Sequence, residues 1–175
     1  MKTVPTLATA LTLLFTLTGN ASQNVTVSVN GEITAGTCDA SVNGDGADAT
    51  VILPTLLVDD LNAKGIAGKT AFTIALSNCV GTLNTGGVFF DNVSGVNSRG
   101  YVNNSGGTAR NTDFILYASD GTTQIKPGDS SAQETYQDIT SGSATQTFNV
   151  AYVTDGKNAT PGTVTGKVTY YIDYK

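Results

Sequence analysis

The residue types that carry most enzymatic chemistry are scarce in this chain. Its 175 residues include no histidine and two cysteines, Cys38 and Cys79. Without histidine there can be no Ser-His-Asp triad, no Cys-His pair and no imidazole ligand for a metal. If the two cysteines are bonded to each other, no free thiolate is left to act as a nucleophile or a ligand. We therefore expect no catalytic residue and no cofactor.

Two acidic segments remain as candidates for acid–base chemistry or cation binding. Asp59 and Asp60 are adjacent carboxylates, but such a pair on a helical turn is more often a solvated face. The segment with Asn43, Asp45 and Asp48 faintly resembles an oxygen-rich calcium loop, yet it lacks the distal glutamate of an EF-hand. Asn, Gly and Asp are also ordinary turn residues. We expect no metal site in either segment.

The start of the chain has the layout of an export signal. Lys2 is followed by an apolar stretch over residues 7–17 and by small residues at 19–21. Because this stretch is too short to span a membrane, it predicts a secretory signal peptide over residues 1–21. In an oxidising compartment Cys38 and Cys79 fit one disulfide, and the alternative is two buried free thiols.

The charge balance restricts the partners. Asp and Glu number 14 against 9 for Lys and Arg, which gives a formal net charge of −5 at pH 7. Nucleic acid and anionic membrane surfaces both require a basic footprint. We therefore expect neither as a partner, and no later segment is apolar enough to predict membrane insertion.

The remainder of the chain predicts short strands separated by turns. Gly, Pro, Asn and Ser punctuate apolar runs, a pattern typical of an all-β sandwich. A short helix is predicted over residues 56–63, before Gly65. Strands are expected over residues 50–53, 72–79, 88–90, 114–118 and 148–152, and from 163 onward. We place one domain over residues 36–175.

The two end segments of the exported chain alternate strictly between apolar and polar residues. Period-two alternation indicates a strand with one apolar face. A long final strand is expected at a sheet edge, where an apolar face needs a partner, and the N-terminal segment could supply one across molecules. The alternating positions are Val25, Val27, Val29, Gly31 and Ile33 at one end, and Val164, Gly166, Val168, Tyr170, Ile172 and Tyr174 at the other.

Four stretches in this order resemble the fimbrial subunits of the bacterial chaperone–usher pathway, the type 1 pilin group. The first runs from Val25 to Cys38 and includes Gly31. The second joins residues 51–54, 61–65 and 72–79, up to the second cysteine. The third covers residues 107–117 with the Asp120-Gly121 turn, and the fourth is residues 162–174 with a tyrosine near its end.

The resemblance implies a fold and a set of partners. The fold is an incomplete immunoglobulin-like β-sandwich that lacks its last strand and is completed by a donor strand from a neighbouring subunit. Residues 22–35 would be the donor extension, with Val25, Val27, Val29, Gly31 and Ile33 inserted. The six C-terminal positions would line the acceptor groove and contact the chaperone. The implied partners are other pilin subunits, a periplasmic chaperone, an outer-membrane usher and a tip adhesin, and the implied destination is a cell-surface fimbria reached through the periplasm.

Two alternatives stay open at this point. A fimbrial adhesin, or another secreted glycan-binding β-sandwich, would use exposed loops such as residues 94–107. Adhesins of the family usually carry a separate lectin domain and lack a donor extension, whereas the pattern of this chain predicts a donor extension. A self-contained secreted sandwich, an enzyme included, would need its seventh strand from its own sequence.

Overall fold

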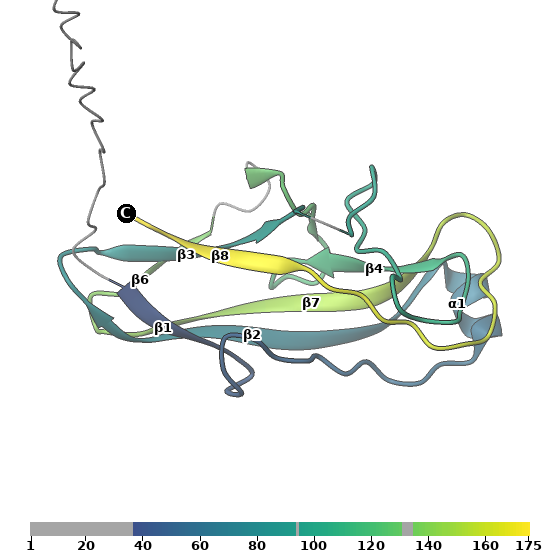
Figure 1. The fold of residues 1–175 in the computed structure, drawn as a ribbon, viewed down its shortest axis with the longest axis horizontal. Helices are drawn as coiled ribbons and strands as arrows, with labels where there is room; N and C mark the ends of the chain where they lie inside the picture. The colour runs from purple at the N-terminus through teal and green to yellow at the C-terminus, as the bar shows by residue number, and fades with distance from the viewer. Residues whose placement is uncertain (1–36, 94, 131–134) are drawn as a thin grey trace, which may run out of the picture. The chain divides into compact units, whose positions relative to one another are not determined.

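The computed structural model describes residues 37–93, 95–130 and 135–175. The predicted signal peptide and all five predicted donor residues therefore lie outside the described residues, within 1–36. The described part contains one helix and eight strands (Figure 1): β1 Thr37–Val42, α1 Val58–Lys64, β2 Ile66–Val80, β3 Thr85–Asp91, β4 Thr112–Tyr117, β5 Gln124–Ile125, β6 Tyr136–Asp138, β7 Ala144–Thr154 and β8 Thr169–Tyr174.

The strands form two antiparallel sheets. The larger has the order β1-β2-β7-β4-β5 and the smaller has the order β6-β3-β8. The longest pairing joins β2 to β7, from Ile66 opposite Val153 to Leu76 opposite Ala144. In the smaller sheet, Val88 of β3 lies opposite Ile172 of β8, and Phe90 lies opposite Tyr170. This is the all-β sandwich that the strand pattern predicts.

Inward-facing side chains of both sheets form the core. The ring of Phe90 from β3 lies edge-on to that of Phe148 from β7, with centroids 5.0 Å apart, and Phe72 from β2 completes the group. Gln146 of β7 is buried among them, and its side-chain oxygen accepts a hydrogen bond of 2.9 Å from the Val88 amide of the other sheet. A buried amide must be satisfied in this way, so Gln146 also fixes how the two sheets sit on each other.

The helix α1 has clear sequence causes at both ends. Asp59 and Asp60 lie in its first turn and Lys64 in its last, which suits the helix dipole. Gly65 follows with a φ of 72°, a left-handed conformation that glycine adopts without strain, and its amide bonds to Leu61. The predicted helix is thus confirmed with its boundaries shifted by one or two residues.

Two strand predictions are wrong in part. Residues 50–53 form no strand, although Val51 and Leu53 are half-buried and Ile52 is exposed, as alternation requires. The final strand begins at Thr169 rather than near residue 163. Before that point the backbone bonds to a loop instead of a strand: the amide of Ala109 donates to Thr163, and those of Ser105 and Gly106 donate to Thr165.

The close approach of this loop depends on one glycine. A side chain at Gly107 would bring its Cβ within 2.1 Å of the Thr163 carbonyl oxygen. Three strands, β1, β5 and β6, have no counterpart in the sequence prediction because they are short or lack a regular alternation. Among the described residues, no helix is long and apolar enough to cross a membrane.

Candidate assembly site

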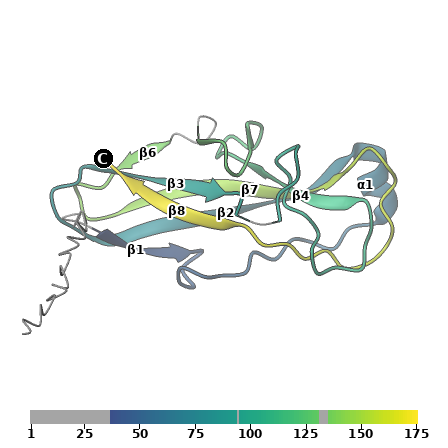
Figure 2. The same cartoon turned by 45° about the horizontal axis from the view of Figure 1, so that its top comes forward.

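Two edge strands from opposite sheets meet along one side of the sandwich. Among the described residues, β1 pairs with β2 alone and β8 pairs with β3 alone, so each has an edge without a ladder partner. Residues 43–53, which continue from β1, have no strand partner there either. Figure 2 shows β1 and β8 running along this side. We call the space between these two free edges the seam. One wall of the seam is β1 with residues 43–53, and the other wall is β8.

The seam has an apolar floor that is incompletely covered. Half-buried hydrophobic side chains from both of its walls pack against the main core. Along β8 and the residues before it, the even-numbered positions from 164 to 174 are half-buried and the odd-numbered ones, apart from Asp173, are exposed. The half-buried residues packed on the core from the two walls are Val51, Leu53, Val168, Tyr170 and Ile172.

The predicted groove residues do not all belong to one strand. Val168 immediately precedes β8, and Tyr170, Ile172 and Tyr174 lie on it. Val164 and Gly166 lie on the earlier stretch that bonds to the loop, although they keep the same half-buried facing. A Cβ on Gly166 would come within 2.9 Å of the Asn103 carbonyl oxygen, so glycine is required there by a close approach of backbone.

Two tyrosine side chains cross the seam. The hydroxyl of Tyr174 accepts a hydrogen bond of 3.1 Å from the Cys38 amide of β1. The hydroxyl of Tyr170 donates a hydrogen bond of 2.9 Å to the Ala47 carbonyl oxygen. Burial, and then the nearby negative charge of Asp48, raises the pKa of Tyr170 above its ordinary value. Sequence reasoning placed both tyrosines on the wall, but nothing in the pattern indicated what their hydroxyls bind.

The disulfide anchors the β1 wall at the same end as Tyr174. Cys38 and Cys79 are bonded with an S–S distance of 2.06 Å, which confirms the predicted pairing. A hollow of about 240 Å³ opens beside it, lined by both cysteines, Tyr174 and the turns that follow β2 and β6. The seam therefore ends in a recess that is covalently tied to the larger sheet.

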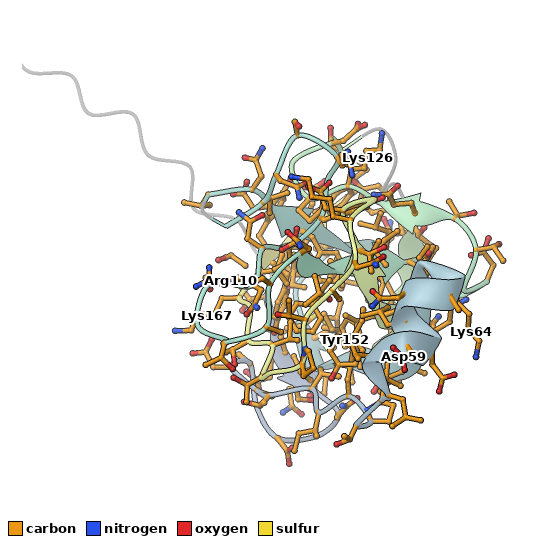
Figure 3. All side chains as sticks on the ribbon, turned by 90° about the vertical axis from the view of Figure 1, so that its right-hand side faces the viewer. Asp59, Lys64, Arg110, Lys126, Tyr152 and Lys167 are labelled. Carbon is orange, nitrogen blue, oxygen red and sulfur yellow. A yellow bond between two sulfur atoms is a disulfide. The ribbon has the colours of Figure 1, made fainter. Side chains whose placement is uncertain are left out.

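The other acidic candidates from the sequence have structural roles. Asn43 has a positive φ of 51° in the turn after β1, and its side-chain oxygen accepts a 2.9 Å hydrogen bond from the Thr73 amide. Asp59 and Lys64 lie on the exposed surface of α1, and both are labelled in Figure 3. Among the described residues, no group of three or more His, Cys, Asp or Glu side chains could hold a metal ion.

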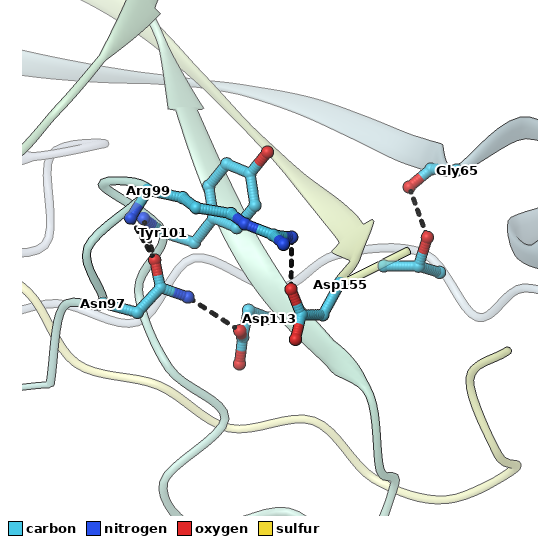
Figure 4. A network of polar contacts seen from close by, with 7 residues as sticks. Gly65, Asn97, Arg99, Tyr101, Asp113 and Asp155 are labelled. Atoms are coloured by element: carbon cyan, nitrogen blue, oxygen red, sulfur yellow. Dashed lines mark hydrogen bonds and ion pairs between the residues drawn. The ribbon is translucent and has the colours of Figure 1, made fainter. Parts of the chain in front are cut away.

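Residues 95–107, in the loop that an adhesin would use, are tied to the sandwich by polar contacts. The carboxylate of Asp113 accepts hydrogen bonds from the Asn104 amide at 2.9 Å and from the Asn97 side chain at 3.2 Å. Arg99 forms an ion pair with Asp155 beyond β7 (Figure 4). A polar hollow of about 610 Å³ lies beside these residues, between residues 104–113 and Asp155. Its carboxylates are already engaged within the loop network.

The two-sheet β-sandwich of this chain has the immunoglobulin-like fold of solved pilus subunits. The P pilus rod subunit PapA superposes with a TM-score of 0.61 at 15% identity, covering 78% of this chain and 99% of that one. A subunit from the structure of a chaperone–usher pilus gives a TM-score of 0.61 at 17% identity, covering 88% and 97%. These likenesses establish the fold.

The chain belongs to the fimbrial protein family, whose model, described as "Fimbrial protein", matches residues 27–175. It is 31% identical to the F17 fimbrial protein of Escherichia coli over 85% of this chain and 86% of that protein. It is 31% identical to the laminin-binding fimbrial subunit ElfA of Escherichia coli O157:H7, over 89% of this chain and 86% of that protein. The major fimbrial subunit SMF-1 of Stenotrophomonas maltophilia is 33% identical over 90% of this chain and 96% of that protein. The protein is thus a structural subunit of a pilus, a class of protein that is not enzymatic.

Proposed function

We propose that this subunit polymerises by donor-strand exchange, with the seam as the acceptor and residues 22–35 of another copy as the donor. The observation that carries the proposal is the seam itself: two free strand edges flank half-buried apolar side chains of the core. Addition of a strand to an exposed sheet edge is an established mode of recognition, and chaperone–pilin complexes are among its known examples. An inserted strand would satisfy both edges at once.

The donor residues match the seam in chemistry and period. Val25, Val27, Val29 and Ile33 fall on one face of an extended strand. Burying an aliphatic side chain contributes about 1.5–3 kcal/mol, so four would contribute about 6–12 kcal/mol. Small domains have a total stability of about 5–15 kcal/mol. A subunit without a donor would accordingly be marginally stable, and the assembled fibre much more so.

The remaining partners follow from the same need. A free apolar seam is an aggregation hazard until it is covered. We therefore place a periplasmic chaperone on the seam first, then exchange for the next subunit's donor at an outer-membrane usher, after removal of a signal peptide over residues 1–21. The pilus would support cell adhesion, with a tip adhesin at its end.

The test of donor insertion is a thermal melt of the chain starting at residue 36, with and without a peptide of residues 22–35. A large and slowly reached rise in melting temperature with peptide is expected. A cooperative melt that the peptide leaves unchanged would contradict an open acceptor.

A paired substitution tests the face of the donor. Gly31→Asp places a charge on the inserted face, and Asn30→Asp places the same charge on the opposite face. We expect Gly31→Asp to abolish polymerisation and leave chaperone binding intact, because the chaperone uses its own strand. Asn30→Asp should polymerise normally. Equal pilus yields from the two variants would refute the assigned facing.

A further inference from the structure

The two tyrosine contacts across the seam involve backbone groups that belong to its free edge. The Cys38 amide and the Ala47 carbonyl are the groups through which β1 and its continuation reach toward β8. Neighbouring strands lie about 4.8 Å apart, so a side chain that starts on β8 and reaches the far wall extends across the place of one strand. Both rings therefore lie where an added strand would put its own inward side chains.

The hydroxyl groups, rather than the rings, make these contacts. A phenylalanine at either position would cover the core to the same extent and would leave the far wall unbonded. Tyr171, the neighbour on β8 that faces outward, illustrates the other use of this side chain: it is 48% exposed and its ring stacks on Phe89 at 5.5 Å. The two faces of β8 thus use tyrosine differently.

From this geometry we infer that Tyr170 and Tyr174 form a latch that holds the seam closed in the donor-free subunit and has to open before a donor strand pairs with the β1 wall. The inference rests on the proposed donor-strand exchange and adds its regulation. The latch joins two sheets that, at this side of the sandwich, share no backbone ladder among the described residues. Opening it exposes the Cys38 amide and the Ala47 carbonyl to the incoming backbone.

The latch has two consequences for assembly. It stabilises the subunit while no donor is bound, because it joins the β1 wall, which the disulfide holds, to β8 of the smaller sheet. It also slows exchange, because each hydroxyl bond has to break before a backbone bond replaces it. Loss of the latch should therefore lower the stability of the donor-free subunit and speed strand uptake, and it should leave the donor-filled state nearly unchanged.

The experiment measures uptake of a fluorescent peptide of residues 22–35 by the full exported chain, kept monomeric at low concentration. The variants are Tyr170→Phe, Tyr174→Phe and the double substitution. One hydrogen bond contributes about 1 kcal/mol net, which corresponds to about a fivefold change in rate. We expect uptake to be about fivefold faster for each single variant and faster again for the double variant.

The matched control is Tyr136→Phe. The Tyr136 hydroxyl donates to the Asp173 carboxylate, so this variant also removes a tyrosine bond to β8, but on the side away from the β1 wall. It should destabilise the chain without speeding uptake. If uptake simply followed global unfolding, Tyr136→Phe would speed it as well, and the latch would be refuted.

The outcomes separate the latch from the proposed function. Normal uptake by the wild-type chain with unchanged rates in the seam variants would overturn the latch and leave donor-strand exchange standing. No uptake by any chain would overturn both. Amide exchange at Cys38 gives an independent readout, because Tyr174→Phe should speed it several-fold and Tyr136→Phe should not; equal exchange in the two variants would also overturn the latch.

Discussion

The outer face of β4 and β7 and the β1–β8 seam are two apolar surfaces of the same sandwich that are covered in opposite ways. On the outer face, Ile115, Ala151 and Val153 are buried beneath the loop that carries Tyr101. Hydrogen bonds of Asn97 and the Arg99–Asp155 ion pair hold that loop down. Along the seam, the apolar residues stay half-buried and two tyrosine hydroxyls make the links between the walls.

The two surfaces show that one chain can fold completely and still leave an apolar surface only half covered. The chain uses its own residues to close the outer face of β4 and β7. It leaves the other surface apolar, bordered by free backbone groups and closed by contacts that are weak enough to exchange. A hydrogen bond of about 1 kcal/mol is easily replaced, whereas a packed loop is not.

The largest expected effect comes from freeing the β1 wall. Replacing both cysteines, Cys38→Ser with Cys79→Ser, opens a covalent loop with a sequence separation of 41. The chain-entropy relation gives a loss of about 4 kcal/mol in the free energy of unfolding. Urea denaturation of the variant measures it, and reduced wild-type protein should give the same midpoint. A loss under about 1 kcal/mol would mean that the wall holds itself without the bond.

A smaller effect is expected where the chain covers its own surface. Tyr101→Ala removes the half-buried ring over the outer cluster and should cost about 2 kcal/mol of unfolding free energy, below the range for fully buried aromatic residues. Arg99→Ala in the same loop removes an exposed ion pair and should cost less than about 1 kcal/mol. Chemical denaturation ranks the two, and the reverse order would show that charge, not packing, holds the loop.

Truncation of one isoleucine on each surface should have different effects on the two. Ile172→Ala in the seam should cost about 1 kcal/mol in the donor-free chain and more, about 2–4 kcal/mol, when a donor strand buries the site completely. Ile115→Ala beneath the loop should lower the free energy of unfolding by the same amount in both states, because that side chain is already buried, with 4% exposed, when no donor is bound. Melts with and without donor peptide measure both, and an occupancy-independent cost at Ile172 would contradict the seam as acceptor.

The smallest expected effect is a weakening of the seam at alkaline pH. Burial, and then the charge of Asp48, raises the pKa of Tyr170 above 10.0. A raised pKa means that the folded state holds the proton more tightly, so this stability is present below pH 10 and is lost as pH rises through the folded value. Burial also raises the pKa of Tyr117 and Tyr152, so wild type and a Tyr170→Phe variant should both lose stability at alkaline pH. The stability of Tyr170→Phe should fall less steeply with rising pH than that of wild type in pH-dependent melts, and identical slopes would contradict a raised pKa of Tyr170.

Much of the sandwich could be predicted because its strands alternate. In β2 the buried residues Phe72, Ile74 and Leu76 alternate along the core face, in β7 Phe148 and Val150 do the same, and the short helix is bounded by acidic residues and by Gly65. The strand over residues 50–53 was wrongly predicted for a physical reason. Alternation reports which side chains face the core, and Val51 and Leu53 do face it, but a strand also needs a neighbour for its backbone.

The candidate site was predictable in part for the same reason. The alternation from Val164 to Tyr174 indicated the face toward the core, which the structure shows as half-buried. The loop that bonds to the backbone of Thr163 and Thr165 could not be predicted from periodicity. Its contacts depend on Gly107 and join residues some 60 positions apart in the chain.

The class of fold, the facing of the side chains and the disulfide could be predicted from the residues alone, because these depend on local period and on the pairing of two cysteines. The tertiary structure alone decided which strands lie at sheet edges and which distant groups meet across them. The contacts of Tyr170 with Ala47 and of Tyr174 with Cys38 span more than 120 positions in the chain. Such contacts arise from how two sheets are stacked, a property that no local pattern of residues encodes.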